Sequence, residues 1–408
     1  MGLHKRIIIL LLTAFVSESV MPVSIQEEYA SLSVLSSGKW FRIAVKENGI
    51  YRIEFSKLKQ LGLTNPANPR IYGNNYGQLS YYNDDPKPDD LREISIYLSK
   101  GTDGVFNDGD YLLFYGEGTN RWKYNYSSGE YDFIRHNYSD TAYYFITSSA
   151  TPGRITGDAD QITEPVNFTS GTSDVMYNHE LETENLIKSG REWYQPQSAI
   201  TGTTINPGFK DLVAGEKINY RIRVLGRSPA PTMFRFYEGS ALHLSIMVPE
   251  VNIFSTTGLY ASDILNRGSL LPSSQSPQFE MKFFNNGETG ALGWIDYVRL
   301  QGRAMISFTG KASEFSDCKS IAPGRITEFN IHSTLNGFFV WDISDPFNPE
   351  ILSYSKSGGN NRFRTKTDSI KKFIVFSPES ASVPFFRSAH VTNQNLHGSD
   401  PADMIIAQ

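Results

Sequence analysis

Apolar and polar residues alternate in short runs along most of the chain, which is the pattern of β-strands with one buried face. Gly, Asn, Asp and Pro separate the runs. The pattern predicts a mainly β protein with an N-terminal β domain at 31–150 and a jelly-roll or β-sandwich domain at 190–377. The runs lie at 40–45, 50–55, 70–72, 92–97, 111–115, 142–146, 218–224, 232–237, 279–284, 294–300 and 337–341.

Two local signals predict how these runs connect. The first two runs flank the dipeptide Asn48-Gly49, which is typical of a tight turn, so we expect 40–45 and 50–55 to form a β-hairpin. A short helix is predicted at 56–61, with a serine at its start and Gly62 after its end.

A linker with a second short helix is predicted between the two domains, at 151–189. Asn178 is a favourable helix cap, acidic residues fill the first turn after it, and Gly190 supplies a stop. The sequence therefore predicts a helix over 178–189 that separates two strand-rich regions.

The C-terminal part has a different pattern. Residues 371–376 are apolar on both faces, which is typical of a strand in a parallel sheet covered by helices. A polar loop is predicted at 384–394 and a second apolar strand at 403–407. We therefore expect 378–408 to begin an α/β domain that continues in a longer protein.

Residues 1–24 have the layout of a secretory signal peptide. Lys5 and Arg6 precede the apolar run 7–16, and small polar residues follow it. An uncleaved anchor is the alternative, although the run is short for a bilayer. We expect an exported protein at the cell surface or outer membrane, or in the periplasm.

Charge and cysteine content exclude two classes. The net charge of the 408-residue chain is −5 and its basic residues are scattered, so no nucleic-acid partner is expected. Cys318 is the only cysteine, which excludes an internal disulfide. No glycine-rich oxyanion loop lies near Cys318, and we expect a half-buried structural thiol.

An acidic loop is the one candidate metal site. Its oxygen-bearing side chains suit Ca²⁺, but their order is not that of an EF-hand, and a turn stabilised by Asx residues is the favoured alternative. The candidate ligands are Asp103, Asn107, Asp108 and Asp110. His179-Glu180 does not indicate zinc, because position 183 is Thr and not a second His. No catalytic residue, organic cofactor or other metal is predicted, because no nucleophile, base and oxyanion hole come together.

Several longer blocks carry a family resemblance. They include Asp103-Gly-Val-Phe-Asn-Asp-Gly-Asp110, Val340-Trp-Asp-Ile-Ser-Asp-Pro346 and Asn393-Gln-Asn-Leu-His-Gly398. Further blocks lie at 40–45, 49–52, 113–116, 138–140, 143–147, 179–180, 185–191, 193–194, 294–297 and 403–406. In number, order and spacing they resemble the N-terminal region of the type IX secretion system sortases of Bacteroidetes, which are gingipain-type cysteine peptidases.

The resemblance implies a cell-surface protein whose family cleaves C-terminal sorting domains from secreted cargo and attaches the cargo to anionic lipopolysaccharide. The implied partners are such cargo proteins, outer membrane components of the secretion system and the lipopolysaccharide. The family's catalytic His and Cys lie in a caspase-like α/β domain, whose first strand resembles 403–407. Neither has a matching position here, so the resemblance implies a non-catalytic front portion of the peptidase.

The alternative is a secreted β-sandwich module for glycan or protein adhesion without catalysis. Exposed aromatic side chains are the usual platform for sugars, although aromatic residues in such sheets more often belong to the core. The candidate platform residues are Tyr81, Tyr82, Trp122 and Trp193.

Overall fold

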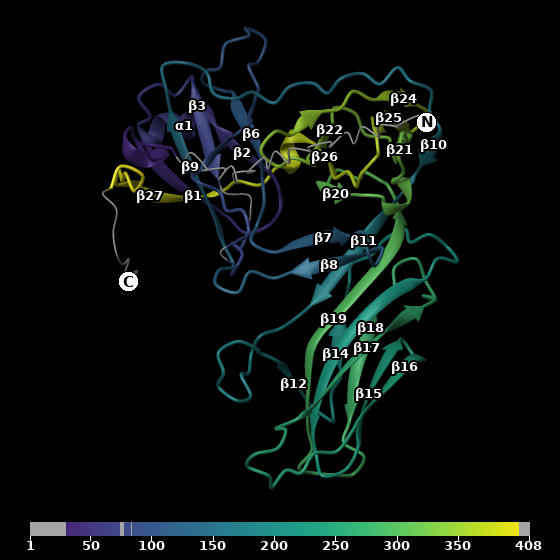
Figure 1. Ribbon diagram of the computed structural model, residues 1–408. Helices are drawn as coiled ribbons and strands as arrows, with labels where there is room; N and C mark the ends of the chain where they lie inside the picture. Colours follow the sequence, from purple (N-terminus) through teal and green to yellow (C-terminus); the bar gives the residue numbers. More distant parts are fainter. Residues whose placement is uncertain (1–29, 74–76, 83, 400–408) are drawn as a thin grey trace, which may run out of the picture.

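The computed structural model describes residues 30–73, 77–82 and 84–399 (Figure 1). Strands β1 to β27 dominate this part of the chain, and α1 (Phe55–Leu61) is its one α-helix. The predicted mainly β fold is confirmed. The predicted signal peptide at 1–24 and the predicted strand at 403–407 lie outside the described residues. Within the described ranges, no helix is long and apolar enough to cross a membrane.

The first domain consists of two packed sheets. One sheet has the order β27-β1-β9-β3-β4 and the other the order β2-β6-β5. Isoleucine, leucine and aromatic side chains from both sheets form its core. The strands are β1 (Trp40–Val45), β2 (Gly49–Glu54), β3 (Pro69–Gly73), β4 (Arg92–Ile94), β5 (Tyr97–Leu98), β6 (Tyr111–Gly116), β9 (Ala142–Ser148) and β27 (Phe385–Val391), with the 3-10 turn η1 (Val34–Ser36) before them.

The predicted hairpin at Asn48-Gly49 is wrong, although both strands are present. Strand β1 pairs with β9 and β27, whereas β2 pairs with β6. The two strands face each other across the core because each points its alternate apolar side chains into it. Asn48 contributes to this arrangement, since its Oδ1 accepts a hydrogen bond from the Gly118 backbone N–H at 2.8 Å.

The structure confirms the stop of the first predicted helix but not its cap. Gly62 adopts the left-handed conformation (φ 73°) that favours glycine, directly after α1. Glu54 occupies the N-cap position, and its side chain makes no capping hydrogen bond. Ser56 therefore lies inside the helix.

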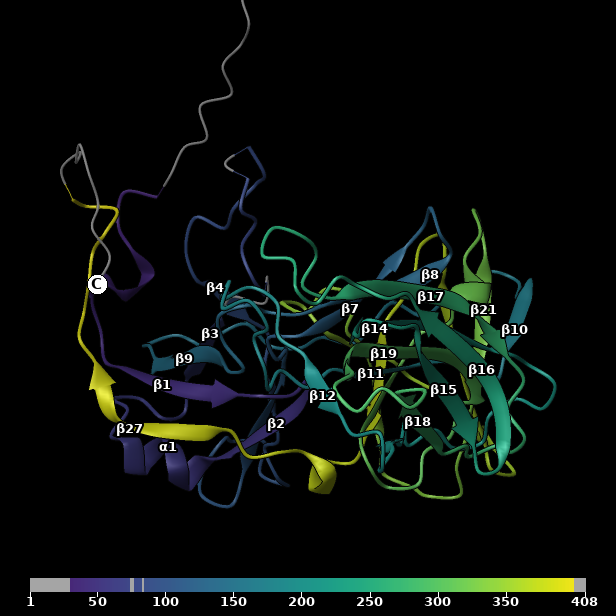
Figure 2. The same ribbon diagram turned by 90° about the horizontal axis from the view of Figure 1, so that it is seen from below.

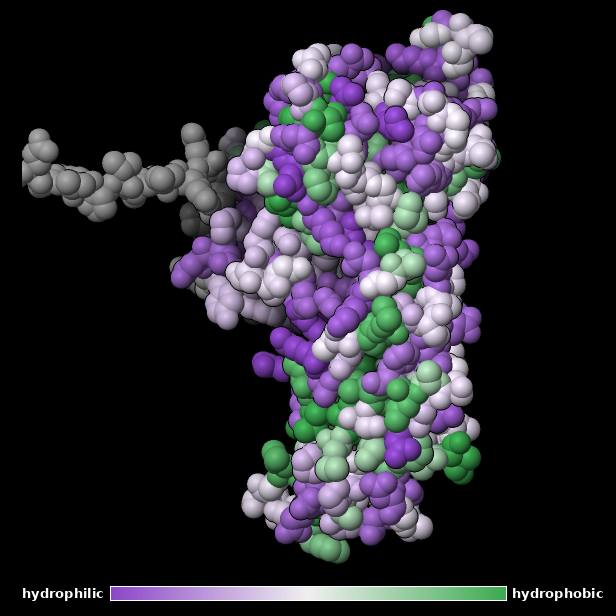
Figure 3. Space-filling view, turned by 90° about the vertical axis from the view of Figure 1, so that its right-hand side faces the viewer, coloured by the Kyte–Doolittle hydropathy of each residue, from purple (hydrophilic) through white to green (hydrophobic). Residues whose placement is uncertain are grey.

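The first sandwich contains two antiparallel sheets around a core of aliphatic and phenylalanine side chains. Their orders are β11-β19-β14-β17, with β12 beside β19, and β13-β18-β15-β16. The strands are β11 (Thr172–His179), β12 (Gln195–Gln197), β13 (Thr203–Ile205), β14 (Ile218–Arg227), β15 (Thr232–Glu238), β16 (Ala241–Val248), β17 (Ser262–Leu270), β18 (Phe279–Phe284) and β19 (Leu292–Met305). Figure 3 shows apolar side chains gathered over the lower half of the molecule, where this sandwich lies.

The helix predicted at 178–189 is wrong. Residues up to His179 extend β11, and the following residues form a loop without a helix. Contacts across the sheet replace the local helix signals: the Asn178 Oδ1 accepts a hydrogen bond from Arg299 Nε at 3.0 Å. In the loop, Glu184 accepts a hydrogen bond from the indole N–H of Trp294 at 2.8 Å. The side chains whose pattern predicted the start of a helix therefore form hydrogen bonds with residues of β19.

A second sandwich occupies the rest of the region predicted as one domain. Its sheet orders are β10-β21-β25-β24 and β20-β26-β22-β23, and it has its own phenylalanine-rich core. The region 190–377 therefore contains two cores. The strands are β10 (Phe168–Ser170), β20 (Ser313–Phe315), β21 (Ile326–His332), β22 (Phe339–Asp342), β23 (Glu350–Ile351), β24 (Ser355–Ser357), β25 (Asn360–Lys366) and β26 (Phe373–Phe376), with the 3-10 turns η2 (Cys318–Ser320) and η3 (Pro378–Ser380).

Strand β26 is buried as predicted, but its sheet is not parallel. It pairs antiparallel with β20 and β22. Its two faces are apolar because each meets a different core. Phe373 and Val375 belong to the core of the second sandwich, whereas Ile374 and Phe376 pack with Trp341 against side chains of the first domain. A strand shared by two antiparallel layers thus has the same sequence pattern as a parallel strand.

A hairpin ties the first domain to the first sandwich. Strands β7 (Arg121–Asn125) and β8 (Glu130–Ile134) pair with each other and reach across between the two units (Figures 1 and 2). The Tyr131 hydroxyl donates to Asp174 at 2.9 Å, and Gln301 Nε2 donates to the Tyr131 carbonyl at 2.7 Å. Arg221 forms ion pairs with both Glu130 and Asp132 of this hairpin. These contacts fix the relative position of the two units.

Candidate functional site: a C-terminal strap on the first domain

Cys318 has the environment of a structural thiol, as predicted. Its side chain is half-buried, and its Sγ donates a hydrogen bond to Asp174 Oδ1 at 3.2 Å. Burial, together with the nearby Asp174 carboxylate, raises the pKa of Cys318 to about 12. Because the thiolate is the reactive form, this cysteine is a poor nucleophile at neutral pH.

We expect Cys318 to react with iodoacetamide about a thousandfold more slowly than a free cysteine at pH 7.5, because its pKa rises from 9.0 to about 12. The rate should increase about tenfold per pH unit above pH 8. Labelling followed by mass spectrometry measures it, with the urea-unfolded chain as the control. A folded-state rate equal to the control rate would contradict the structure.

The acidic loop is built as a series of turns. Asp103 accepts hydrogen bonds from the Val105 N–H (2.9 Å) and from Asn107 Nδ2 (2.8 Å). Asp110 is buried and accepts from the Asn107 N–H at 2.9 Å, whereas Asp108 pairs with Lys59 at 2.6 Å. These contacts favour the turn interpretation over the calcium interpretation. No group of three or more His, Cys, Asp or Glu residues suited to a metal ion occurs in the described ranges.

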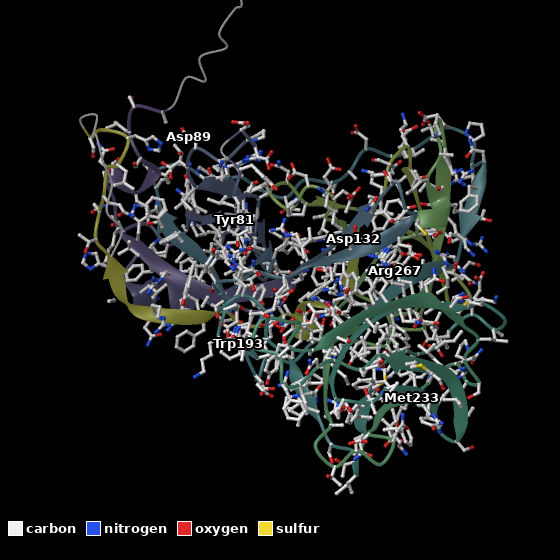
Figure 4. All side chains as sticks on the ribbon, turned by 60° about the horizontal axis from the view of Figure 1, so that its bottom comes forward. Tyr81, Asp89, Asp132, Trp193, Met233 and Arg267 are labelled. Atoms are coloured by element: carbon white, nitrogen blue, oxygen red, sulfur yellow. The ribbon has the colours of Figure 1, made fainter. Side chains whose placement is uncertain are left out.

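The aromatic residues considered as a sugar platform do not gather on one surface. Trp122 packs edge-on against Phe133 at 5.0 Å within the β7-β8 hairpin. Tyr81 and Trp193 lie on separate loops (Figure 4), and among described residues no ring contact joins any two of the four. The geometry therefore gives the adhesion alternative no support.

The strongest functional feature is a segment that we call the strap, residues 377–399. It leaves the second sandwich after β26 and returns to the first domain. Ser382 exchanges two backbone hydrogen bonds with β2, at 2.8 Å and 2.9 Å. Strand β27 then adds to the open edge of β1 by antiparallel pairing. Lys57 of α1 lies over the ring of Phe386, 4.9 Å from its centroid.

The strap corrects one prediction and bears on another. The polar loop expected at 384–394 is largely strand, because β1 would otherwise leave its outer backbone groups unpaired. Residues 378–399, where the start of an α/β domain is predicted, pack on the first domain, and the α/β domain itself stays a prediction. The adjacent Phe385 and Phe386, in an otherwise polar segment, were the available sequence signal for a strand here.

Side-chain hydrogen bonds hold the end of the strap. Asn393 Nδ2 donates to the carbonyls of Leu35 (3.1 Å) and Gly38 (3.0 Å). Asn395 Oδ1 accepts from the Ser33 backbone N–H at 2.9 Å. Leu35, Gly38 and Ser33 belong to no sequence motif, so these hydrogen bonds could not be predicted from the sequence.

His397 lies between Ser33 Oγ and Asp89 Oδ1, at 2.8 Å from each. A serine hydrolase triad has the same order of groups. Here, however, Ser33 is buried, and its Oγ also accepts a hydrogen bond from the His397 backbone N–H at 3.1 Å. A hydrogen bond from the Ala30 N–H, followed by the contact with His397, holds the pKa of Asp89 below its ordinary value. The arrangement is a tether rather than a catalytic site.

Removal of the tether should free the end of the strap. We expect Asn395→Ala/His397→Ala to increase the rate of proteolytic cleavage within 392–399 at least about fivefold, with a global stability loss near 1 kcal/mol per lost hydrogen bond. Limited proteolysis with mass spectrometry measures the cleavage. His390→Ala is the control, because His390 is exposed on β27. Equal cleavage of both variants would argue against the tether.

A search of the solved structures shows what the whole arrangement resembles. The chain superposes on dimeric latent PorU from Porphyromonas gingivalis with a TM-score of 0.76, at 19% sequence identity and over 91% of this chain. The chain has the fold of the PorU N-terminal region. It covers 35% of the PorU chain, so about two thirds of PorU has no counterpart here.

Other comparisons add no argument. A Paenibacillus sp. cycloisomaltooligosaccharide glucanotransferase matches 52% of this chain and 47% of its own, with 9% identity and a TM-score of 0.17. The infectious bursal disease virus VP2 particle matches 83% of this chain and 63% of its own, with 8% identity and a TM-score of 0.20. No protein-family model and no curated protein matches. The PorU comparison is therefore evidence of shared fold alone.

Proposed function

We propose that this chain is the non-catalytic N-terminal portion of a type IX secretion system sortase. The observation that carries the proposal is the PorU-type fold over 91% of the chain, combined with its coverage of only 35% of PorU. The described residues contain neither a metal cluster nor an activated thiol. The portion would serve as the rigid support of a cysteine peptidase domain.

The strap gives this support a physical basis. Residues up to Ser399 are held on the first domain by β27 and by the tether, so any segment that follows starts from a fixed point. In the proposed parent protein, a thiolate of the peptidase domain attacks the cargo peptide and the acyl group passes to an amine on anionic lipopolysaccharide. The partners would be cargo proteins with C-terminal sorting domains and outer membrane components of the secretion system, at the cell surface.

The test compares the native protein with the isolated chain. We expect the native protein to exceed 45.8 kDa and to be labelled at neutral pH by a thiol-directed peptidase probe, such as a peptidyl acyloxymethyl ketone. The isolated chain should remain unlabelled, and its Cys318→Ser variant controls for residual reaction. A native protein no larger than this chain, or one without a labelled cysteine, would overturn the proposal.

A further inference from the structure

Strand β25 of the second sandwich extends beyond its partner on one edge. Its residues 360–362 pair with β24, but β25 continues to Lys366, and within the described ranges no strand pairs with this edge after Arg362. The chain before β24 turns away to the other sheet, where the Leu352 backbone N–H donates to the Val340 carbonyl at 2.8 Å. The last part of β25 therefore keeps an open edge, to which a further strand can pair.

The pairing on the other side of β25 shows which backbone groups this edge presents. Directly after the strand, the Thr367 N–H donates to the Arg325 carbonyl at 3.0 Å, on the side of β21. Successive residues of a strand direct their backbone groups to opposite sides. Arg364 therefore directs its N–H and C=O groups to the open edge, as does Lys366.

A groove with a volume of about 420 Å³ lies along this edge. Arg362, Phe363 and Arg364 of β25 line it, together with 352–355 where the chain diverges from β25. The opposite wall is the linker segment 159–162, on its way across the second sandwich to β10 (Figure 1). The volume is in the range of ligand-binding clefts. A strand of four residues is about 13 Å long, so the groove suits a short extended segment.

Side chains of β25 alternate in character along the groove. Phe363 and Thr365 are buried on the inner face of the sheet. The exposed side chains of the outer face are those of Arg362, Arg364 and Lys366. Glu328 and Glu164 form ion pairs with the second and third of these. The guanidinium of Arg362 has no ion-pair partner in the part of the chain that the structure describes, so its positive charge is available to a bound molecule.

We propose that this groove binds an extended segment of a partner protein, which adds to the edge of β25 as a further strand. The segment runs antiparallel to β25, as β21 and β24 do. The residue opposite Arg364 then exchanges two backbone hydrogen bonds with it. Such main-chain bonds supply the affinity in strand addition, and side chains supply the specificity.

The alternation along β25 determines which segment fits. Neighbouring strands place side chains of the same face next to each other. Acidic side chains of the segment therefore lie beside Arg362 and Arg364, and apolar side chains lie beside Phe363. Asp160 lines the opposite wall, so the preference for acidic residues is confined to the side of the groove that β25 forms. The recognised class is a strand of alternating acidic and apolar residues, and its binding requires no peptidase domain.

A fluorescein-labelled hexapeptide of alternating glutamate and valine tests the site on the complete chain. Fluorescence anisotropy should show saturable binding, and a lysine-valine peptide of equal length should bind at least about tenfold more weakly. Arg362→Glu should weaken binding of the glutamate peptide at least about tenfold. The matched control is Arg267→Glu, because Arg267 is an exposed arginine of β17 in the first sandwich (Figure 4), and its affinity should equal that of the wild type.

Backbone methylation separates strand addition from simple charge attraction. In the antiparallel arrangement, the glutamates direct their N–H groups to β25 and the valines direct theirs away from it. N-methylation of the glutamates should therefore weaken binding at least about tenfold, and N-methylation of the valines less than about threefold. Thermal unfolding verifies that both protein variants are folded. No saturable binding up to about 1 mM peptide, equal affinities of the two arginine variants, or equal effects of the two methylations would overturn the proposal.

Discussion

Replacement of Arg303 by methionine is expected to lower the free energy of unfolding by about 3–5 kcal/mol. Arg303 Nη1 lies 2.7 Å from Asp174 and 2.6 Å from Asp317, and the three side chains are 9%, 8% and 0% exposed. Without the guanidinium, two carboxylates remain buried without a positive partner. The cost is large because burial deprives them of solvation by water.

Urea denaturation measures this loss, with Arg364→Met as the control. Arg364 pairs with Glu328 at 3.0 Å, but its side chain is 46% exposed, so its removal should cost no more than about 1 kcal/mol. The triple variant Arg303→Met/Asp174→Asn/Asp317→Asn should recover part of the loss, because it removes the unpaired charges. Equal losses in Arg303→Met and Arg364→Met would show that burial does not govern this network.

Truncation of Phe373 to alanine is expected to destabilise the second sandwich by about 3–5 kcal/mol. Phe373 is fully buried at the centre of an aromatic cluster, with ring centroids of Phe315, Phe329 and Phe363 at 5.1–5.2 Å. The surrounding rings belong to three other strands, so they cannot all move to fill the cavity.

The control for Phe373→Ala is Phe385→Ala on the strap. Phe385 is 64% exposed, and its truncation should cost less than about 1 kcal/mol. Thermal unfolding by calorimetry can resolve whether the second sandwich unfolds apart from the other units. A loss below about 1 kcal/mol for Phe373→Ala would show that this cluster is not close-packed.

Strand positions were largely predictable from the sequence, whereas strand partners were not. The alternation at 40–45 and 50–55 depends on the local requirement that one face be buried, and both strands are present as β1 and β2. Their pairing depends on β6, β9 and β27, which lie far away in the sequence. Similarly, β26 is apolar on both faces because it separates two cores, which no local pattern distinguishes from a parallel sheet.

At 178–189, by contrast, local sequence signals predicted a helix that the structure does not contain. Asn178 and the acids after it favour a helix start, but they bind Arg299 and Trp294 of a neighbouring strand. The thiol environment of Cys318 followed from its residue type and composition. The tether of His397 could not be predicted, because Ser33, Asp89 and His397 are brought together only by the return of the chain.

The pairing of β27 with β1 also determines the order in which this protein can fold. Strand β1 begins at Trp40, but its edge partner ends at Val391, so the sheet of the first domain closes only after residue 391 has been synthesised. Pairing between residues this far apart in the sequence slows folding, because bringing the two strands together costs conformational entropy before their contact forms. Until then, the edge of β1 is open to pairing with other strands, so the incompletely synthesised chain is prone to association through this edge.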